Sequence, residues 1–301
     1  MWVVGIDEAG YGPNLGPMVQ AAVALYLPDD DPAGWETLKS VVRKARGKDD
    51  GRLLIDDSKK VFSRGGLEAL EAGIVHSLGL KSESFDEFLG RAALPSCLDD
   101  LRAECWFDGE EHLPIGTHAP IDRSPFESCR CSTSLVPATL FNQIVDGSGS
   151  KGTVLACGLT ALMGATRTIG DREPVLFICD KHGGRNFYAA MLQAAFPEGW
   201  VVVERESADE SRYRIEQLDR PIAVTFRPRA DGDSISVALA SMMCKYLREV
   251  CMRQFNRFWA KHVPGLAPTA GYPLDAKRYY DAIRPAMAKL GLTADQVWRK
   301  R

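Results

Sequence analysis

The chain has 301 residues, 45% of them hydrophobic, and its 37 basic and 40 acidic side chains give a net charge of −3. This composition supports a substantial core in one large domain or two ordinary ones. No run approaches the ~18 apolar residues of a membrane span, and the first residues lack the charged-then-apolar pattern of a secretory signal. We therefore expect a cytoplasmic protein without membrane contact, whose eight irregularly spaced cysteines are reduced.

The first predicted element is a buried strand that ends in two acidic residues. Residues 2–6 form an apolar run, and the glycine- and proline-rich stretch 10–17 stops it abruptly after Asp7 and Glu8. Carboxylates seldom lie beside a core strand unless they are paired or bound to metal. Because neighbouring side chains of a strand point to opposite faces, Asp7 and Glu8 reach one metal pair only if the chain bends between them.

A second strand is predicted over residues 20–27, and the motif Asp-Ser-Lys-Lys at 57–60 then precedes a helix through residues 67–78. The first two residues of this motif can cap the helix, which gives the motif a structural role. Lys59 has a second interpretation, as a contact to phosphate. The residues from about 86 to 135 contain scattered prolines, which is typical of a turn-rich insertion.

A third carboxylate ends another apolar strand, which runs from residue 175 to Asp180. The stretch 181–186 that follows holds two bases, an imidazole and two glycines, so a phosphate can bind there; the alternative is a flexible loop with solvated charges. His182, beside a proposed ligand, is suited to move protons, and Lys181 is kept with it as a possible accessory residue.

The next part of the chain predicts additions to the sheet and then a long helix. Residues 187–195 indicate a helix, and residues 200–205 and 222–226 indicate strands that widen the sheet. The strand around residue 226 leads to Asp231 and Asp233, both candidates for a fourth carboxylate. A helix from residue 234 to about residue 260 follows, with apolar positions at helical spacing.

Five motifs in the same order make the chain resemble type 2 ribonucleases H, the ribonuclease HII and HIII group. They are Gly5-Ile6-Asp7-Glu8-Ala9-Gly10-Tyr11-Gly12-Pro13 with Gly16-Pro17, Asp57-Ser58-Lys59-Lys60, the strand ending at Asp180, Ala238-Leu239-Ala240-Ser241-Met242-Met243-Cys244-Lys245, and Gly271-Tyr272-Pro273. Ungapped registration with the family pattern places the last catalytic aspartate at Asp231, and it leaves Asp233 as the helix cap.

The resemblance implies that Asp7, Glu8, Asp180 and Asp231 are catalytic and bind the metals. Two divalent ions ~4 Å apart can make the attacking water more acidic and stabilise the leaving oxygen in phosphodiester hydrolysis. Hard cations prefer oxygen ligands, so four carboxylates predict a two-metal site for Mg²⁺ or Mn²⁺ rather than zinc.

The resemblance also implies the substrate contacts. The backbone of Gly10 and Gly12 would contact the 2′-hydroxyl, Lys59 a phosphate, and Tyr272 the sugar at the RNA/DNA junction. Tyr11 stands where the family has arginine, so it stacks on a base or sugar or is an ordinary exposed turn aromatic. Two further positions after Tyr272 differ from the family pattern: Leu274 stands where the family has threonine, and Lys277 where it has histidine.

The predicted fold is thus an α/β ribonuclease H-like fold, a mixed central sheet flanked by helices, in one catalytic domain over residues 1–301. It carries the insertion at about 86–135 and a basic helical region at about 241–301. The implied activity is endonucleolytic cleavage of the RNA strand of RNA/DNA hybrids, or at ribonucleotides in DNA, to 3′-hydroxyl and 5′-phosphate ends. A related metal nuclease with another nucleic-acid substrate and a non-catalytic nucleic-acid-binding paralogue remain alternatives.

The distribution of charge suits a nucleic-acid partner better than the total does. Residues 241–301 contain twelve Lys or Arg and four Asp or Glu, a balance of +8, so residues 1–240 carry −11. We expect basic side chains of this region to line one wall of a cleft above the acidic site, or else to form a solvated helix face. They are Arg248, Arg253, Arg257, Lys261, Lys277 and Arg278. The segment 298–301 is expected to be a nucleic-acid-binding tail or a disordered end.

Overall fold

The computed structural model describes residues 1–47, 50–80, 83–116, 118 and 123–300. Part of the expected insertion, residues 117 and 119–122, and the last residue of the basic tail, Arg301, lie outside the described residues. The main strands are β1 (Trp2–Ala9), β2 (Met18–Tyr26), β7 (Arg130–Val136), β8 (Val175–Asp180), β9 (Trp200–Glu206), β10 (Ser211–Glu216) and β11 (Ile222–Arg227). Short strand pairs are β3 (Val42–Arg43) with β4 (Leu53–Leu54) and β5 (Glu83–Ser84) with β6 (His112–Leu113). The helices are α1 (Ser58–Leu78), α2 (Phe85–Ala92), α3 (Pro95–Arg102), α4 (Ala138–Ser148), α5 (Lys151–Thr166), α6 (Ala189–Ala195), α7 (Ile235–His262) and α8 (Pro273–Lys289).

The main strands form one mixed sheet in the order β7-β2-β1-β8-β11-β10-β9. β1 runs parallel to β8, and β8 runs parallel to β11, whereas the other neighbours are antiparallel. The carboxyl ends of the three parallel strands therefore meet at one edge of the sheet. This arrangement confirms the predicted mixed α/β fold with helices on both faces.

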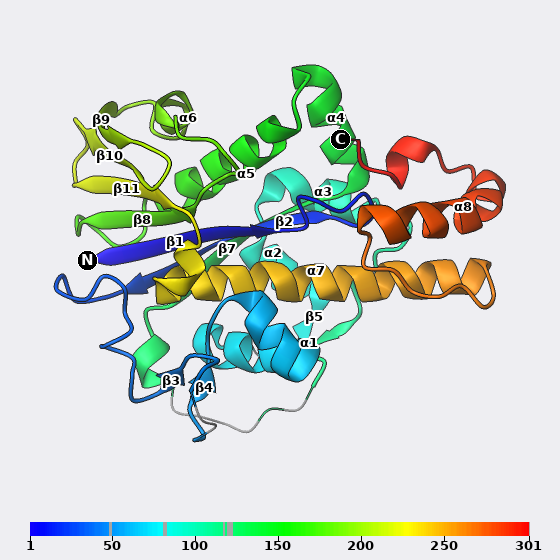
Figure 1. Cartoon of the computed structure of the whole chain (residues 1–301), viewed down its shortest axis with the longest axis horizontal. Coiled ribbons are helices and arrows are strands. Elements are labelled where there is room, and N and C mark those ends of the chain that lie inside the picture. The colour runs from blue at the N-terminus through cyan, green and yellow to red at the C-terminus, as the bar shows by residue number, and fades with distance from the viewer. Residues whose placement is uncertain (48–49, 81–82, 117, 119–122, 301) are drawn as a thin grey trace.

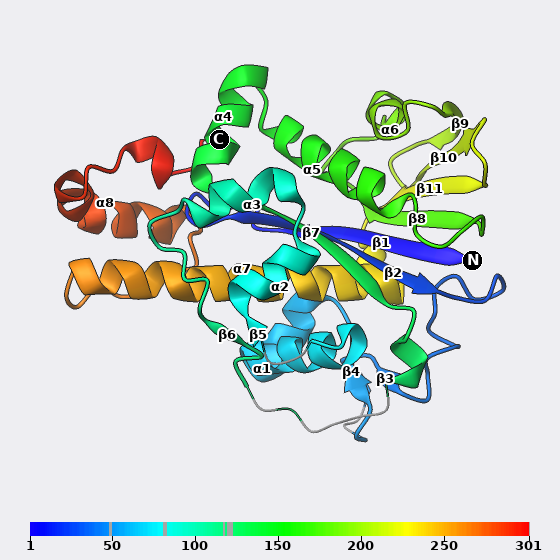
Figure 2. The same ribbon diagram turned by 180° about the vertical axis from the view of Figure 1, so that it is seen from behind.

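Helices cover the two faces of the sheet separately (Figures 1 and 2). α7 runs along one face with α1 packed against it, and α5 and α6 cover the other face. Alternation along β1 supplies both cores, because Val3 belongs to the cluster around α7 whereas Val4 and Ile6 belong to the cluster around α5.

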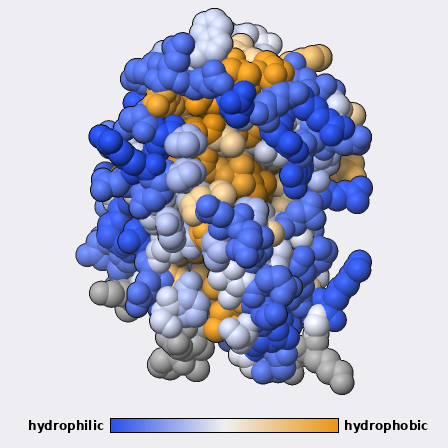
Figure 3. All heavy atoms as spheres, turned by 90° about the vertical axis from the view of Figure 1, so that its left-hand side faces the viewer, coloured by the Kyte–Doolittle hydropathy of each residue, from blue (hydrophilic) through white to orange (hydrophobic). Residues whose placement is uncertain are grey.

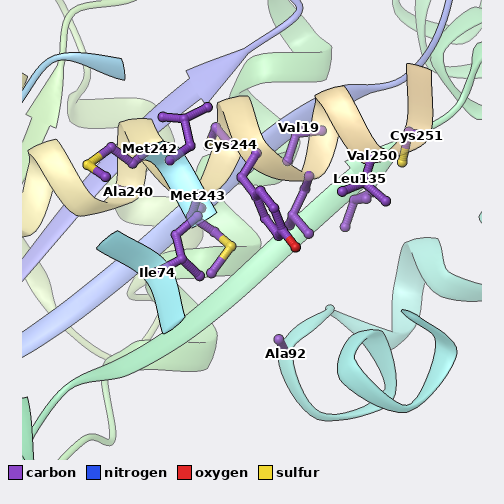
Figure 4. Packing of buried hydrophobic residues seen from close by; sticks show 14 of the residues in the cluster. Val19, Ile74, Ala92, Leu135, Ala240, Met242, Met243, Cys244, Val250 and Cys251 are labelled. Carbon is purple, nitrogen blue, oxygen red and sulfur yellow. The ribbon is translucent and has the colours of Figure 1, made fainter. Parts of the chain in front are cut away.

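The long helix α7 fills the middle of the larger core, and its position confirms the helix predicted from residue 234. Figure 4 shows buried side chains of α7 together with residues of α1, β2 and β7, all from one hydrophobic cluster. Burying a side chain such as Met243 or Ile74 stabilises the fold by about 1.5–3 kcal/mol. Gly5 permits this packing, because a Cβ there would lie 2.2 Å from the Val237 nitrogen of α7.

The helix α1 begins where its sequence predicts. Asp57 is the N-cap, and its carboxylate accepts a hydrogen bond from the Lys59 N–H over 2.8 Å. Two consecutive glycines, Gly65 and Gly66, have non-helical backbone angles and kink the helix. The part of α1 before Gly65 therefore points in a different direction from the part after Gly66.

The insertion at about 86–135 is more regular than predicted. It contains most of α2, the helix α3 and nearly all of β7, which pairs with β2 as an edge strand of the sheet. The start of α2 carries a capping box between Ser84 and Glu87, a signal that was present in the sequence. The scattered prolines obscured it, since Pro95 starts a helix rather than a turn.

The second addition widens the sheet, as predicted, but by more than the expected strands. β10 (Ser211–Glu216) lies between β9 and β11 and was missed, although its burial alternates strictly along the strand. The helix expected over 187–195 begins two residues later, at Ala189. Among the described helices, none has the length and apolar character that crossing a bilayer requires.

Candidate active site

The three motif aspartates come from neighbouring strands. β1 and β8 stay in parallel register up to the residues before Asp7 and Asp180, so these two carboxylates follow side by side. β11 lies on the other side of β8, and the chain then enters the short helix η2 (Ala230–Gly232), which carries Asp231. The Ala230 N–H donates a hydrogen bond to Asp180 Oδ1 over 3.4 Å, which joins η2 to the end of β8.

Glu8 belongs to the same strand end but to the other face. β1 stays paired with β2 through Ala9, so the bend expected between Asp7 and Glu8 is not seen. Asp7 therefore lies on the α7 face, whereas Glu8 lies on the α5 face. The Glu8 carboxylate still interacts electrostatically with Asp7 and Asp180 across the strand end.

Helix α7 supplies neighbours to Asp7. The Ser241 hydroxyl lies close enough to the Asp7 carboxylate to lower its pKa, and its oxygen is 3.0 Å from Ser58 Oγ. Cys244, one turn further along, donates its thiol to the Asp7 carbonyl oxygen over 3.2 Å. The motif around Ser241 thus holds both ends of the Asp7 residue.

The carboxyl groups resist ionisation. Burial, together with the charges of Asp180 and Asp231, raises the pKa of Asp7 to about 7, although the Ser241 hydroxyl acts to lower it. Burial and the charges of Asp7 and Asp180 raise the pKa of Glu8 to about 8, against the opposing effect of Lys59. Burial also raises the pKa of Asp180 and of Asp231. The cluster therefore has more negative charge than its protein neighbours balance.

A divalent cation fits this cluster by its chemistry. All four motif donors are carboxylate oxygens, the ligands that Mg²⁺ and Mn²⁺ prefer, and a cation would supply the missing positive charge. In the described ranges, no three His, Cys, Asp or Glu side chains come together as a ready ligand group. Closing the set requires side-chain rotation, mainly of Glu8, because β1 directs it to the face opposite Asp7.

Two lysines of the α1 motif have different surroundings. Lys59 is exposed, and its charge acts on the carboxylates of Glu8 and Asp180. Lys60 instead forms an ion pair with buried Asp56, with 3.0 Å between Nζ and Oδ1. Lys59 is therefore the lysine of this motif that is exposed and whose charge reaches the carboxylates.

Two buried arginines hold the glycine-rich loop that follows β1. Arg299 donates to the carbonyl oxygen of Gly10 over 2.6 Å and also to that of Pro13. Arg248 donates to the carbonyl oxygens of Leu15, over 3.2 Å, and Pro17, over 2.5 Å. Within the described residues, the N–H groups of the loop tip at 11–12 have no protein acceptor, so they are available to a ligand.

Residues 298–300 therefore form neither the nucleic-acid-binding tail nor the disordered end that the sequence led us to expect. Arg299 is only 1% exposed. Its backbone N–H donates to the Asn14 carbonyl over 2.8 Å, and the Asn14 side chain returns a hydrogen bond to the Arg299 carbonyl over 3.0 Å. Asn142 of α4 fixes the same segment by donating to the Trp298 carbonyl over 2.8 Å. This segment is an ordered part of the loop's support.

The Gly-Tyr-Pro motif joins the same loop. The Gly271 carbonyl accepts a hydrogen bond from the Asn14 N–H over 2.8 Å, and Gly271 has a φ of +81°. A Cβ there would lie 2.5 Å from the Leu15 carbonyl oxygen, so only glycine allows this contact. Tyr272, the N-cap residue of α8, is 53% exposed, and Leu274 beside it is 96% exposed. Both side chains are open to a ligand.

The stretch after Asp180 has two buried members. Lys181 is 8% exposed, and its ammonium donates to Asn186 Oδ1 over 2.8 Å and to the Ser207 carbonyl over 2.5 Å. It is a structural residue and not the phosphate contact or accessory residue expected. Burial and the nearby charge of Arg185 lower the pKa of His182 to about 4, so its imidazole is neutral at neutral pH.

The two candidates for the fourth carboxylate, Asp231 and Asp233, have different surroundings. Asp231 interacts electrostatically with Asp180 and Asp57, whereas Asp233 is exposed. The prediction that Asp233 caps α7 is wrong, because Ser234 is the N-cap and makes no side-chain capping bond. Asp231 is the candidate that lies with the other carboxylates.

The basic face expected along α7 is largely occupied. Arg248 is 3% exposed and lies under the glycine-rich loop, so it cannot line a cleft. Arg257 forms ion pairs with Asp108 at 2.8 Å and Glu111 at 3.1 Å, and Arg253 pairs with Glu111 at 3.4 Å. The insertion thus neutralises part of the positive charge that the sequence attributed to nucleic-acid binding.

No protein-family model and no curated protein matches the chain. Solved structures with a similar fold include ribonuclease H2 from Pyrococcus horikoshii OT3, with 14% identity and a TM-score of 0.46 over 99% of this chain and 92% of that one. RNase H3 from Aquifex aeolicus has 11% identity and a TM-score of 0.48 over 99% of this chain and 71% of that one. Bst-RNase HIII in complex with Mn²⁺ has 15% identity and a TM-score of 0.47 over 100% of this chain and 66% of that one. The likeness concerns the fold, and the function is argued from this chain's own residues.

Several residues at the site had weak or no sequence signals. Ser241 lay within a motif, but its hydrogen bond to Asp7 depends on the packing of α7 against β1. Arg299 and Asn142 looked like ordinary polar residues, and only the fold brings them to the loop. Lys151 of α5 lies over the Tyr11 ring at 4.4 Å, a contact between segments far apart in sequence.

Proposed function

We propose that this chain is a metal-dependent endonuclease that hydrolyses the RNA strand of RNA/DNA hybrids, or cleaves at ribonucleotides in DNA, to 3′-hydroxyl and 5′-phosphate ends. One observation carries the proposal: four carboxylates from three neighbouring strand ends, Asp7 buried and the other three half-buried, act on one another with too little positive charge around them. Retaining such a cluster is costly unless cations and a substrate use it.

The position of each residue indicates its role in the proposed reaction. Asp7, Asp180 and Asp231, with Glu8 after rotation, would hold Mg²⁺ or Mn²⁺. Two such ions, when bound, make water a better nucleophile and stabilise the leaving oxygen. Ser241 keeps the Asp7 carboxylate oriented, and Lys59 is placed to bind a phosphate oxygen next to the cluster.

The glycine-rich loop would recognise the sugar. Its carbonyls turn toward Arg248 and Arg299, which leaves the N–H groups at 11–12 for the 2′-hydroxyl and the adjoining phosphate. Tyr272 is exposed beside this loop and is suited to pack against a sugar. These contacts support a substrate that contains RNA.

The test is cleavage of end-labelled duplexes with Mg²⁺ or Mn²⁺, comparing an RNA/DNA hybrid, DNA with one ribonucleotide, and all-DNA. We expect metal-dependent cutting of ribonucleotide-containing strands, lost in Asp7→Asn and kept in Asp219→Asn, a matched change at an exposed site on the other end of the sheet. Cleavage of all-DNA would favour a nuclease with another substrate. Binding without cleavage in either metal would favour a non-catalytic protein.

A further inference from the structure

Two basic side chains meet at Tyr11, on the α5 side of the acidic cluster. The Lys151 ammonium lies over the Tyr11 ring, 4.4 Å from its centre. The Arg185 guanidinium reaches the first turn of the same helix, because a Cβ on Gly152 would lie 3.6 Å from Arg185 Nη2. The loops after β1 and β8 and the start of α5 therefore converge on one small surface.

This surface borders the carboxylates. Tyr11 lies three residues after Glu8, and Arg185 lies five residues after Asp180. Burial raises the pKa of the Tyr11 hydroxyl, the Glu8 charge raises it further, and the Arg185 charge lowers it, so Tyr11 is close to both charged groups. Tyr11 is therefore near the acidic cluster and near both cations.

Arg185 differs from the arginines of the neighbouring strands. Arg212 and Arg227 share Glu210, at 2.6 Å and 2.8 Å, and Arg214 pairs with Glu204 at 2.6 Å. Over the residues that the structure describes, Arg185 has no carboxylate within ion-pair distance, and its side-chain hydrogen bond is to the thioether sulfur of Met191, 4.0 Å away. A half-buried guanidinium without a carboxylate at ion-pair distance favours an anionic ligand.

We infer that Lys151 and Arg185, which flank Tyr11, bind one backbone phosphate of the nucleic-acid substrate next to the cleavage site. This inference rests on the proposed function, because it takes nucleic acid as the substrate. Lys59 belongs to α1 on the opposite face of the sheet from α5 (Figure 1). The strand would thus be held on both sides of the carboxylates.

The experiment measures binding of an RNA/DNA hybrid by fluorescence anisotropy, without divalent metal, over roughly 50–200 mM KCl. The variants are Lys151→Ala, Arg185→Ala and their double variant, with Arg214→Ala as an exposed arginine elsewhere on the sheet. Removal of one phosphate-binding cation reduces the slope of log affinity against log salt by about 1. We expect the double variant to bind about tenfold or more weakly at low salt, with a slope reduced by about one unit or more, and Arg214→Ala to match the native chain.

Charge-retaining variants test whether the cations act as charges. Lys151→Arg and Arg185→Lys should keep the native salt slope, and thermal unfolding of every variant establishes that it is folded. A folded double variant with native affinity and slope would overturn the inference while leaving the proposed function intact. A native chain that neither binds nor cleaves hybrids would overturn both.

Discussion

The two ends of the central sheet are built on opposite principles. At the carboxyl end, β1, β8 and η2 place like charges together, and burial raises their pKa values. At the amino end, seen in Figure 3, apolar side chains are exposed around a pocket lined by residues such as Leu176, Ile215 and Leu218. The carboxyl end therefore concentrates charge at a cost in stability, which is typical of a functional edge.

Removing a carboxylate gives the largest expected difference between the two ends. Asp7→Asn should lower cleavage by about a thousandfold or more, since it removes a ligand and a charge from the reacting site. It should also raise the free energy of unfolding near pH 8 by about 1–3 kcal/mol in metal-free buffer, because it removes a buried like charge. Urea unfolding of both proteins measures this gain, and a less stable Asp7→Asn protein would contradict it.

Activity and stability should depend on pH in opposite directions. The pKa values of Asp7 and Glu8 rise from 3.8 and 4.5 in the unfolded chain to about 7 and about 8 in the folded one. The folded protein therefore binds more protons, so metal-free stability should fall as pH rises from about 4 to about 8. Cleavage should rise about tenfold or more between about pH 6 and about pH 8, as the ligands ionise. If the cleavage rate and the free energy of unfolding both rose, or both fell, with increasing pH, this prediction would be wrong.

Two buried arginines allow a matched comparison of the ends. Arg299 donates to loop carbonyls at the carboxyl end, and Arg220 donates to the Ile169 carbonyl over 2.5 Å at the amino end. Changing either to alanine should cost about 2–3 kcal/mol of stability. Only Arg299→Ala should also lower kcat/KM, by about tenfold, because it releases the loop tip at 11–12. Equal kcat/KM in the two folded variants would make Arg299 purely structural.

Added Mg²⁺ should stabilise one end only. A ligand present at about 100 times its Kd for the folded state adds about 2.7 kcal/mol, or roughly 4 °C in Tm for a chain of this size. The native chain and Leu218→Ala should show this rise in thermal scans, whereas Asp7→Asn should lose most of it. An equal rise in Asp7→Asn would place the metal elsewhere.

The smallest effect concerns the apolar end itself. Leu218→Ala should lower stability by about 1 kcal/mol, because Leu218 is only partly buried, and it should leave cleavage unchanged. Chemical unfolding and the duplex assay measure the two quantities. A loss of cleavage would show that the two ends are coupled.

Much of the fold and the grouping of the carboxylates followed from local patterns. Asp7 and Asp180 each end an apolar run, and parallel strands place such ends together, so their proximity was predictable. The helix α7 was predictable because its apolar positions repeat at helical spacing over many turns.

The rest depended on contacts that no local pattern encodes. The side of the strand end on which Glu8 lies follows from β1 pairing regularly to Ala9. The burial of Arg248 and the pairing of Arg257 with Asp108 depend on where the loop and the insertion dock. From composition alone, these arginines were expected to be free to bind nucleic acid. In the fold, Arg248 holds the glycine-rich loop and Arg257 pairs with the insertion.

The bond between Asn14 and Arg299 joins positions 285 residues apart. During synthesis, at about 5–20 residues per second, roughly 15–60 s separate the appearance of these two partners. The carboxylates of β1 and β8 exist long before the loop beside them has its support. A growing chain therefore carries these carboxylates before Arg299 supports the loop beside them, and the proposed substrate site would become complete only when residues 298–300 have docked.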